Sequence, residues 1–372
     1  MALVSPNQAH VVYDGTRWAV PSLSDVPQLG VGATPDGYNR LVVASDAVLF
    51  NHAGAGHQVK INKAAAGDTA SLLFQTGFGG RAELGTAGSD DFTFKVSADG
   101  SSWAEALRIE AATGRVTAPI SGWREMLTGP RTYYVDPLLG SDTRDGQAAG
   151  QGAFATLDRA VTEVAHVDGS GHLVTVQLAD GVYDLGAVPV GIMAPLGGGG
   201  IEIIGNVTNP NAVTVTSSGA AMELVTGRLK LRGVRLEMSG TEPTLRVLSG
   251  GVLEVDQVTF GTAGGHIDLV GGRLEGGGSY AIDGGGAYHL RLSQGAVLGG
   301  GVQALTLSNT PNFTTAFAIC TMAGQADFSG HSFAGAATGR RFDVATQGVI
   351  QSGGIVLPGD TAGSVQSGGI YV

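Results

Sequence analysis

Four short stretches in the middle of the chain share one pattern: MELVTGRL at 222–229, LRVLSGGVL at 245–253, IDLVGGRL at 267–274 and LRLSQGAVL at 290–298. Their first residues lie 23, 22 and 23 positions apart. Each stretch alternates apolar and polar residues, turns at a glycine and resumes with a second apolar run, which is typical of two short strands joined at a corner. Strands this short bury a hydrophobic face only by stacking on the next copy, so the repeat predicts a solenoid.

Equivalent positions of the four copies carry charges of alternating sign, namely Glu223, Arg246, Asp268 and Arg291. In parallel coils about 4.8 Å apart they would form a column of opposite neighbours, which stabilises a sheet surface. Leucine-rich repeats have a comparable period, but the chain lacks their leucine and asparagine signature and their helical stretches. We therefore predict a right-handed parallel β-helix. Its expected core residues are Met222, Leu224, Leu245, Val247, Ile267, Leu269, Leu290 and Leu292.

The composition excludes several classes of protein. With 62 Gly, 14% charged and 43% hydrophobic residues, the chain of 372 residues is too apolar for disorder and lacks the strict glycine period of collagen. The formal net charge of −11 argues against nucleic acid or an anionic membrane as a partner. Because Cys320 is the single cysteine, no intrachain disulfide is possible.

We expect no cofactor, no bound metal and no membrane insertion. The histidines and the cysteine lack metal-ligand spacing, and no apolar run reaches 18 residues. Asp142 and Asp145 before Gly146 resemble a calcium loop, but the acidic residues are not two apart as in an EF-hand, so we predict a turn. The first residues lack a secretory signal, which predicts synthesis and assembly in the bacterial cytoplasm.

The N-terminal third is expected to hold two further parts. Residues 1–30 contain VVYDGTRW at 11–18 followed by Pro21 and Pro27, which predicts a hairpin and an extended segment used for attachment or oligomerisation. Residues 31–120 alternate apolar and polar runs between glycine turns, which predicts a small antiparallel β domain. Its strands are expected at 40–44, 58–62, 71–75, 82–84, 92–96 and 107–110.

Part of this domain resembles a module of fibre and spike proteins from alphaproteobacterial prophages and gene transfer agents. The resemblance covers about 70 residues and rests on LFNHAGAGHQVKINK at 49–63, TASLLFQTGFGGRAELG at 69–85 and DFTFKVS at 91–97. It implies no active site. It implies a structural role on the surface of a virion or phage-like particle and, by analogy, a homotrimer.

After a linker at 121–130, the β-helix is expected at 131–355. The runs YYVDPLLGSDTRDG at 133–146 and FATLDRAV at 154–161 resemble the opening of pectin-lyase-like β-helices in phage tailspikes, with a strand, a Gly/Asp loop and a helix that caps the first coil. Residues 356–372 resemble C-terminal tails of prophage fibres and are expected to pack on the last coil. One face of the capping helix would hold Phe154, Leu157, Val161, Val164 and Ala165.

Two groups of residues are candidates for a functional site. Glu254 and Glu275 each lie three residues after a corner glycine, so they would be neighbours on adjacent coils, as a glycan-cleaving pair requires. A solvated acidic face, neutralised by Lys230, is the simpler interpretation. The second group consists of possible glycan-binding residues at the edge of the coils, where aromatic side chains more often just cover the core: Tyr183, Tyr280, Asp283 and Tyr288.

The predicted function is a structural spike or fibre protein of a tailed phage or gene transfer agent. It would attach to other particle proteins through residues 1–30 and bind a host-surface polysaccharide. One alternative is a tailspike depolymerase that cleaves capsular polysaccharide, acting as a hydrolase or a lyase. Another is a purely structural spacer. The sequence does not separate a head spike from a tail fibre.

Overall fold

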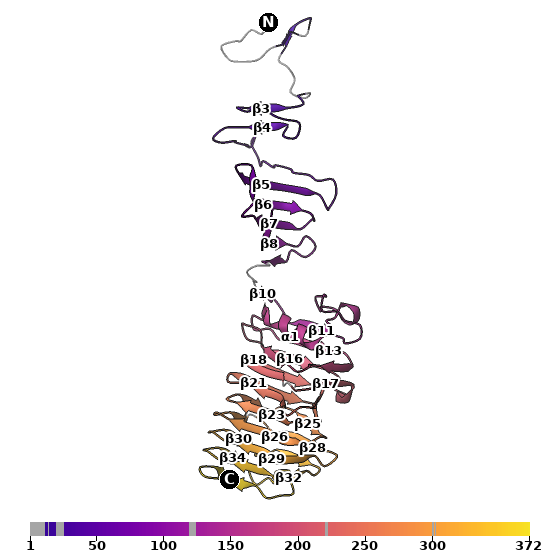
Figure 1. The fold of residues 1–372 in the computed structure, drawn as a ribbon, viewed down its shortest axis with the longest axis vertical. Coiled ribbons are helices and arrows are strands. Elements are labelled where there is room, and N and C mark those ends of the chain that lie inside the picture. The colour runs from indigo at the N-terminus through magenta and orange to yellow at the C-terminus, as the bar shows by residue number, and fades with distance from the viewer. Residues whose placement is uncertain are drawn as a thin grey trace. The chain divides into compact units, whose positions relative to one another are not determined.

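The computed structural model describes residues 12–13, 15–19, 26–118, 124–219, 222–299, 301 and 303–372. The fold is mostly β, with an antiparallel sheet toward the N-terminus followed by a parallel β-solenoid of about eight turns and one short helix (Figure 1). The chain divides into two compact units between residues 104 and 115. This architecture confirms the predicted fold class.

The N-terminal strands pair in three groups. The hairpin predicted near residue 14 is present, because β1 (Val12–Tyr13) pairs antiparallel with β2 (Trp18–Ala19). Strands β3 (Leu29–Val31) and β4 (Leu41–Val43) pair in parallel instead. The prediction of a strand at 58–62 is wrong, since those residues form no regular element. A five-stranded sheet follows, with β5 (Thr69–Thr76), β6 (Gly79–Ala87), β7 (Phe92–Val96), β8 (Ala104–Ile109) and β9 (Val116–Thr117).

The solenoid has three faces whose strands pair in parallel from coil to coil. The first face comprises β11 (Arg131–Val135), β13 (Val174–Leu178), β16 (Ile201–Ile204), the second half of β18 (Met222–Arg232), β21 (Gly251–Asp256), β24 (Arg273–Glu275), β27 (Val297–Gly299), β30 (Gln325–Asp327), β34 (Val349–Gln351) and β36 (Ile370–Tyr371). The second comprises β15 (Val190–Met193), the first half of β18, β20 (Pro243–Val247), β23 (Gly265–Val270), β26 (Gly286–Ser293), β29 (Asn312–Cys320), β32 (Thr338–Gly339), β33 (Phe342–Val344) and β35 (Ser364–Val365).

The third face is formed by β14 (Gly181–Asp184), β17 (Val213–Ser217), β19 (Arg235–Met238), β22 (Thr259–Phe260), β25 (Ser279–Ile282), β28 (Ala304–Leu307) and β31 (Ser332–Ala334). Outside the three faces, β10 (Glu125–Met126) pairs with β12 (Val167–Asp168), and two short 3₁₀ helices lie at Gly150–Gly152 and Pro210–Ala212. The segment predicted as a C-terminal tail contributes β35 and β36, which continue two of the faces.

The core of the solenoid is the one that the repeat predicts. All eight residues expected there are at most 2% exposed. Met222, Leu245, Ile267 and Leu290 are consecutive partners in the ladder of the second face. Period-2 alternation turns every second side chain inward, and the coil period stacks these side chains into one apolar column.

Helix α1 (Leu157–Ala165) covers the start of the solenoid, where it packs on β11, β13 and β15. Its N-cap is Thr156, whose hydroxyl oxygen accepts a hydrogen bond from the Arg159 amide at 3.2 Å. The buried face is close to the predicted one and holds Leu157, Ala160, Val161 and Val164. Phe154 is also buried, but it precedes the helix and bridges to Val135 of β11. Among the described residues, the helices are too short or too polar to cross a membrane.

Candidate functional site

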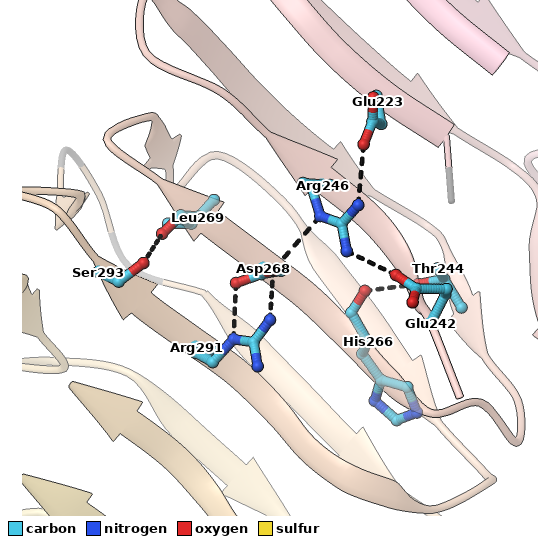
Figure 2. A network of polar contacts seen from close by, with 9 residues as sticks. All are labelled: Glu223, Glu242, Thr244, Arg246, His266, Asp268, Leu269, Arg291 and Ser293. Atoms are coloured by element: carbon cyan, nitrogen blue, oxygen red, sulfur yellow. Dashed lines mark hydrogen bonds and ion pairs between the residues drawn. The ribbon is translucent and has the colours of Figure 1, made fainter. Parts of the chain in front are cut away.

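The column of alternating charges predicted from the repeat is present on the second face of the solenoid (Figure 2). Arg246 lies at its centre and donates hydrogen bonds to Glu223 at 2.8 Å and to Glu242 at 2.6 Å. The Arg246 guanidinium also lies 3.5 Å from an oxygen of Asp268 on the next coil. The register of the coils thus brings Arg246 beside carboxylates on both neighbouring strands.

Asp268 is covered more deeply than its outward position in the repeat suggests, because its side chain is only 2% exposed. Arg291 donates two hydrogen bonds to it, from Nε at 2.8 Å and from Nη2 at 2.6 Å. The Arg291 guanidinium in turn lies 4.6 Å from the centre of the Tyr288 ring. One ring face of Tyr288 is therefore taken by Arg291, and burial raises the pKa of its hydroxyl to about 12. This cluster links adjacent coils of the second face.

Tyr280 lies inside the solenoid, at one end of a series of buried polar groups joined by hydrogen bonds. Its hydroxyl is 2.8 Å from Nε2 of His289, whose Nδ1 is 2.9 Å from Nδ1 of His266. Nε2 of His266 lies 3.0 Å from the carbonyl oxygen of Gly261. Since a carbonyl accepts only, that nitrogen carries the hydrogen, and a neutral His266 then accepts at Nδ1. His289 therefore donates from Nδ1 and accepts the Tyr280 proton at Nε2.

Each donated hydrogen in this series of hydrogen bonds has one acceptor, provided that both imidazoles stay neutral. Burial lowers the pKa of His266 to about 4 and that of His289 well below its usual value. Phe260, Phe313 and Phe317 pack around the two imidazoles. Although histidine and tyrosine are familiar in catalysis, these three side chains are buried. Their hydrogen bonds are therefore part of the solenoid core.

The two candidate catalytic carboxylates are neighbours, as predicted, because Glu254 and Glu275 are partners in the ladder. Arg228 binds both, and its Nη1 lies 2.7 Å from an oxygen of Glu275. Arg273 adds a contact of 3.0 Å to Glu275. The neutralising cation is thus Arg228, not the predicted Lys230. Hydrogen bonding from Arg228 lowers the pKa of Glu275, whereas a general acid in glycan cleavage needs a raised one.

Tyr183 and Asp283 lie on different coils, and each side chain is fixed by contacts within the solenoid. The hydroxyl of Tyr183 donates to the carbonyl of Ala179 at 2.7 Å, and its ring is buried. Asp283 forms an ion pair of 2.6 Å with Arg235. The four proposed glycan-binding residues therefore form no shared exposed surface. Tyr183 nevertheless contributes to the wall of a hollow beside α1.

This hollow, which we name the α1 groove, has a volume of about 630 Å³ and lies between the start of α1 and the β14–β15 connection. Its lining residues are Pro137, Asp142, Ala155, Thr156, Leu157, Asp158, Val182, Tyr183, Asp184, Leu185, Val188, Pro189 and Val190. Its lining includes the carboxylates of Asp142, Asp158 and Asp184 and the exposed aliphatic side chains of Val182 and Val188. Of the described residues that line it, none is a lysine, arginine or histidine. Such a wall suits a ligand with many hydroxyl groups and apolar CH faces.

The loop before the groove is the turn predicted from Asp142 and Asp145. Asp142 accepts hydrogen bonds from the amides of Ala155 and Thr156 at 2.9 and 3.0 Å, so it fixes the entry into α1. Asp145 accepts from the Gln147 amide at 3.1 Å. The described part of the chain holds no cluster of acidic, histidine or cysteine side chains that could bind a metal ion.

The α1 groove was not predicted from the sequence. Its walls come from three segments, at 137–142, 155–158 and 182–190, which lie outside the clear repeats. The available signal was the apolar pair Val182 and Val188 on either side of Asp184, close to the predicted Tyr183. No protein-family model, curated protein or solved structure matches the chain.

Proposed function

We propose that the chain is a structural spike or fibre protein of a phage-like particle, either a tailed phage or a gene transfer agent, and that its solenoid binds a host-surface polysaccharide. The α1 groove is the observation that carries the binding role. The particle role is supported by the resemblance of residues 49–97 to fibre and spike modules. In this proposal residues 1–30 attach to other particle proteins, three copies associate, and the spike is displayed on the particle surface as a head spike or tail fibre.

The groove supports a glycan ligand because its chemistry matches that of a sugar. Asp158 and Asp184 are exposed carboxylates that can accept hydrogen bonds from hydroxyl groups. Val182 and Val188 present aliphatic surface in the same groove, against which the CH face of a pyranose can pack. With carboxylates and without a cation in its lining, the groove favours neutral or amino sugars over polymers of uronic acid.

The test is retention of purified protein on capsulated cells and on the isolated polysaccharide. A matched pair of variants assigns the site: Val188→Arg fills the groove, whereas Val356→Arg changes a residue elsewhere in the solenoid, and the wild-type side chains are 73% and 69% exposed. We expect Val188→Arg to lose retention and Val356→Arg to keep it. Equal retention of both variants would contradict the assignment of the groove.

A depolymerase remains the second candidate because Glu254 and Glu275 are adjacent. Their shared ion pair with Arg228 counts against it. Shortened polysaccharide chains, restored to full length by Glu254→Gln or Glu275→Gln, would establish cleavage. Neither retention nor cleavage would favour the structural spacer.

A further inference from the structure

Residues 26–104, the described bulk of the N-terminal unit, form no hydrophobic core within one chain. All residues from 26 to 104 are described, and the buried ones among them are Gly85, Thr93 and Ser97. The solenoid, by contrast, buries an apolar column of its own. A β unit of this size gains its stability by burying apolar surface, so the N-terminal unit needs apolar cover from outside the described chain.

The uncovered surface is one face of the antiparallel sheet. Leu72, Leu84 and Phe94 are partners across β5, β6 and β7, and Phe74, Ala82 and Val96 form the next row. Side chains two residues apart on a strand share a face, so these six residues form one apolar surface, which we name face A. Leu72, Phe74, Phe94 and Val96 are between 39% and 53% exposed.

The opposite face of the same sheet is mainly polar. Leu73, Glu83 and Lys95 are partners across the three strands, and Ser71 donates a hydrogen bond of 2.7 Å to Glu83. The sheet is therefore amphipathic, as expected when one face is buried and the other is in water. Two residues of face A, Leu72 and Leu84, line a hollow of about 320 Å³ together with Val59, Ile61 and Phe92. Val59 and Ile61 belong to the segment that forms no strand in the single chain.

We infer that face A is the contact surface between copies of this chain and that the N-terminal unit acquires its core by that association. Charge permits the contact, since residues 26–100 hold five basic and seven acidic side chains within a chain of net charge −11. In a symmetric assembly every copy contributes the same surface. The apolar area that one copy exposes is therefore matched by an equal apolar area on its partners. The inference rests on the proposed function only for the number of copies, three.

The experiment compares two variants of the full chain that change exposed residues of similar size and on opposite faces of β5 to β7. Phe74→Asp with Phe94→Asp places charges on face A, and Leu73→Asp places one on the polar face. Molar mass is measured by light scattering after gel filtration. We expect the wild type and Leu73→Asp to be oligomers and the face A variant to run as a monomer. The thermal transition of the solenoid, which has its own core, reports that each variant is folded.

A second measurement locates the contact directly. Cys320 is buried, so an introduced thiol is the reactive one. We expect Phe94→Cys to give disulfide-linked chains on mild oxidation and Leu73→Cys to give none. A monomeric wild type, a face A variant that keeps its mass, or dissociation by Leu73→Asp would each overturn the inference. Because polysaccharide retention is assigned to the solenoid, failure of the binding proposal would leave these mass measurements unaffected.

Discussion

Acid should destabilise the solenoid through the buried pair of His266 and His289. Both imidazoles are neutral in the folded chain, but in the unfolded chain they take up protons below their usual pKa of about 6.5. The unfolded state therefore binds more protons as the pH falls, and the free energy of unfolding decreases. The stability that depends on neutral imidazoles is fully present above pH 6.5. It is lost progressively as the pH falls toward 4, where His266 also titrates in the folded state.

The size of the effect follows from the pKa of His266. A drop from 6.5 to about 4 gives a loss of about 2.5 kcal/mol at pH 4.5. Burial also lowers the pKa of His289 well below 6.5, so His289 acts in the same direction as His266. The loss from His266 alone is a sizeable part of the stability of a typical domain, about 5 to 15 kcal/mol.

The assay is the thermal midpoint, measured by calorimetry between pH 7.5 and 4.5. The matched variant is His266→Gln with His289→Gln, because an amide donates and accepts hydrogen bonds but does not titrate. We expect it to be less stable than the wild type at pH 7.5 and to lose much less stability on acidification. His166→Gln, at an exposed position, should leave the wild-type slope unchanged. Equal slopes for the wild type and the double variant would refute the reasoning.

Three further outcomes follow from the solenoid. Asp268→Ala leaves two arginines without their shared buried carboxylate and should cost about 3 kcal/mol or more in chemical denaturation, and a loss below about 1 kcal/mol would contradict that role. Arg228→Gln should raise the pKa of Glu275 toward its usual range in an NMR titration, with little change in stability because the pair is partly exposed. Gly264→Ala should lower the thermal midpoint, since its Cβ would lie 2.0 Å from a backbone oxygen, whereas Gly277→Ala meets no atom within 4 Å and should not.

The repeat predicted the register of the coils because a fixed period determines which residues become neighbours. Glu223 and Arg246 are ladder partners for that reason, and Leu245 and Ile267 share the core. The period does not predict how deeply a side chain is covered. Asp268 is buried because Arg291 folds over it, and this depends on rotamers as well as on spacing.

Residues outside the repeated strands were harder to predict. Tyr280 was expected at an edge, but its strand turns it inward to a histidine, which period-2 alternation alone does not identify as a partner. The α1 groove arises where loops of different length meet, and loop geometry leaves no periodic signal in the sequence. The alternation of apolar and polar residues predicted a strand at 58–62, yet those residues form no regular element.

The ladder from Leu245 to Ile267 to Leu290 also makes length an adjustable property of this molecule. Removing or duplicating 22 or 23 residues between equivalent positions would bring the same kinds of side chain together again, and would shorten or lengthen the solenoid by about 4.8 Å. An insertion of one residue within a strand would instead turn the side chains that follow it in that strand to the opposite face, so that charged residues point where apolar ones stack. The reach of such a protein can therefore change in whole coils, while the surfaces at either end keep their composition.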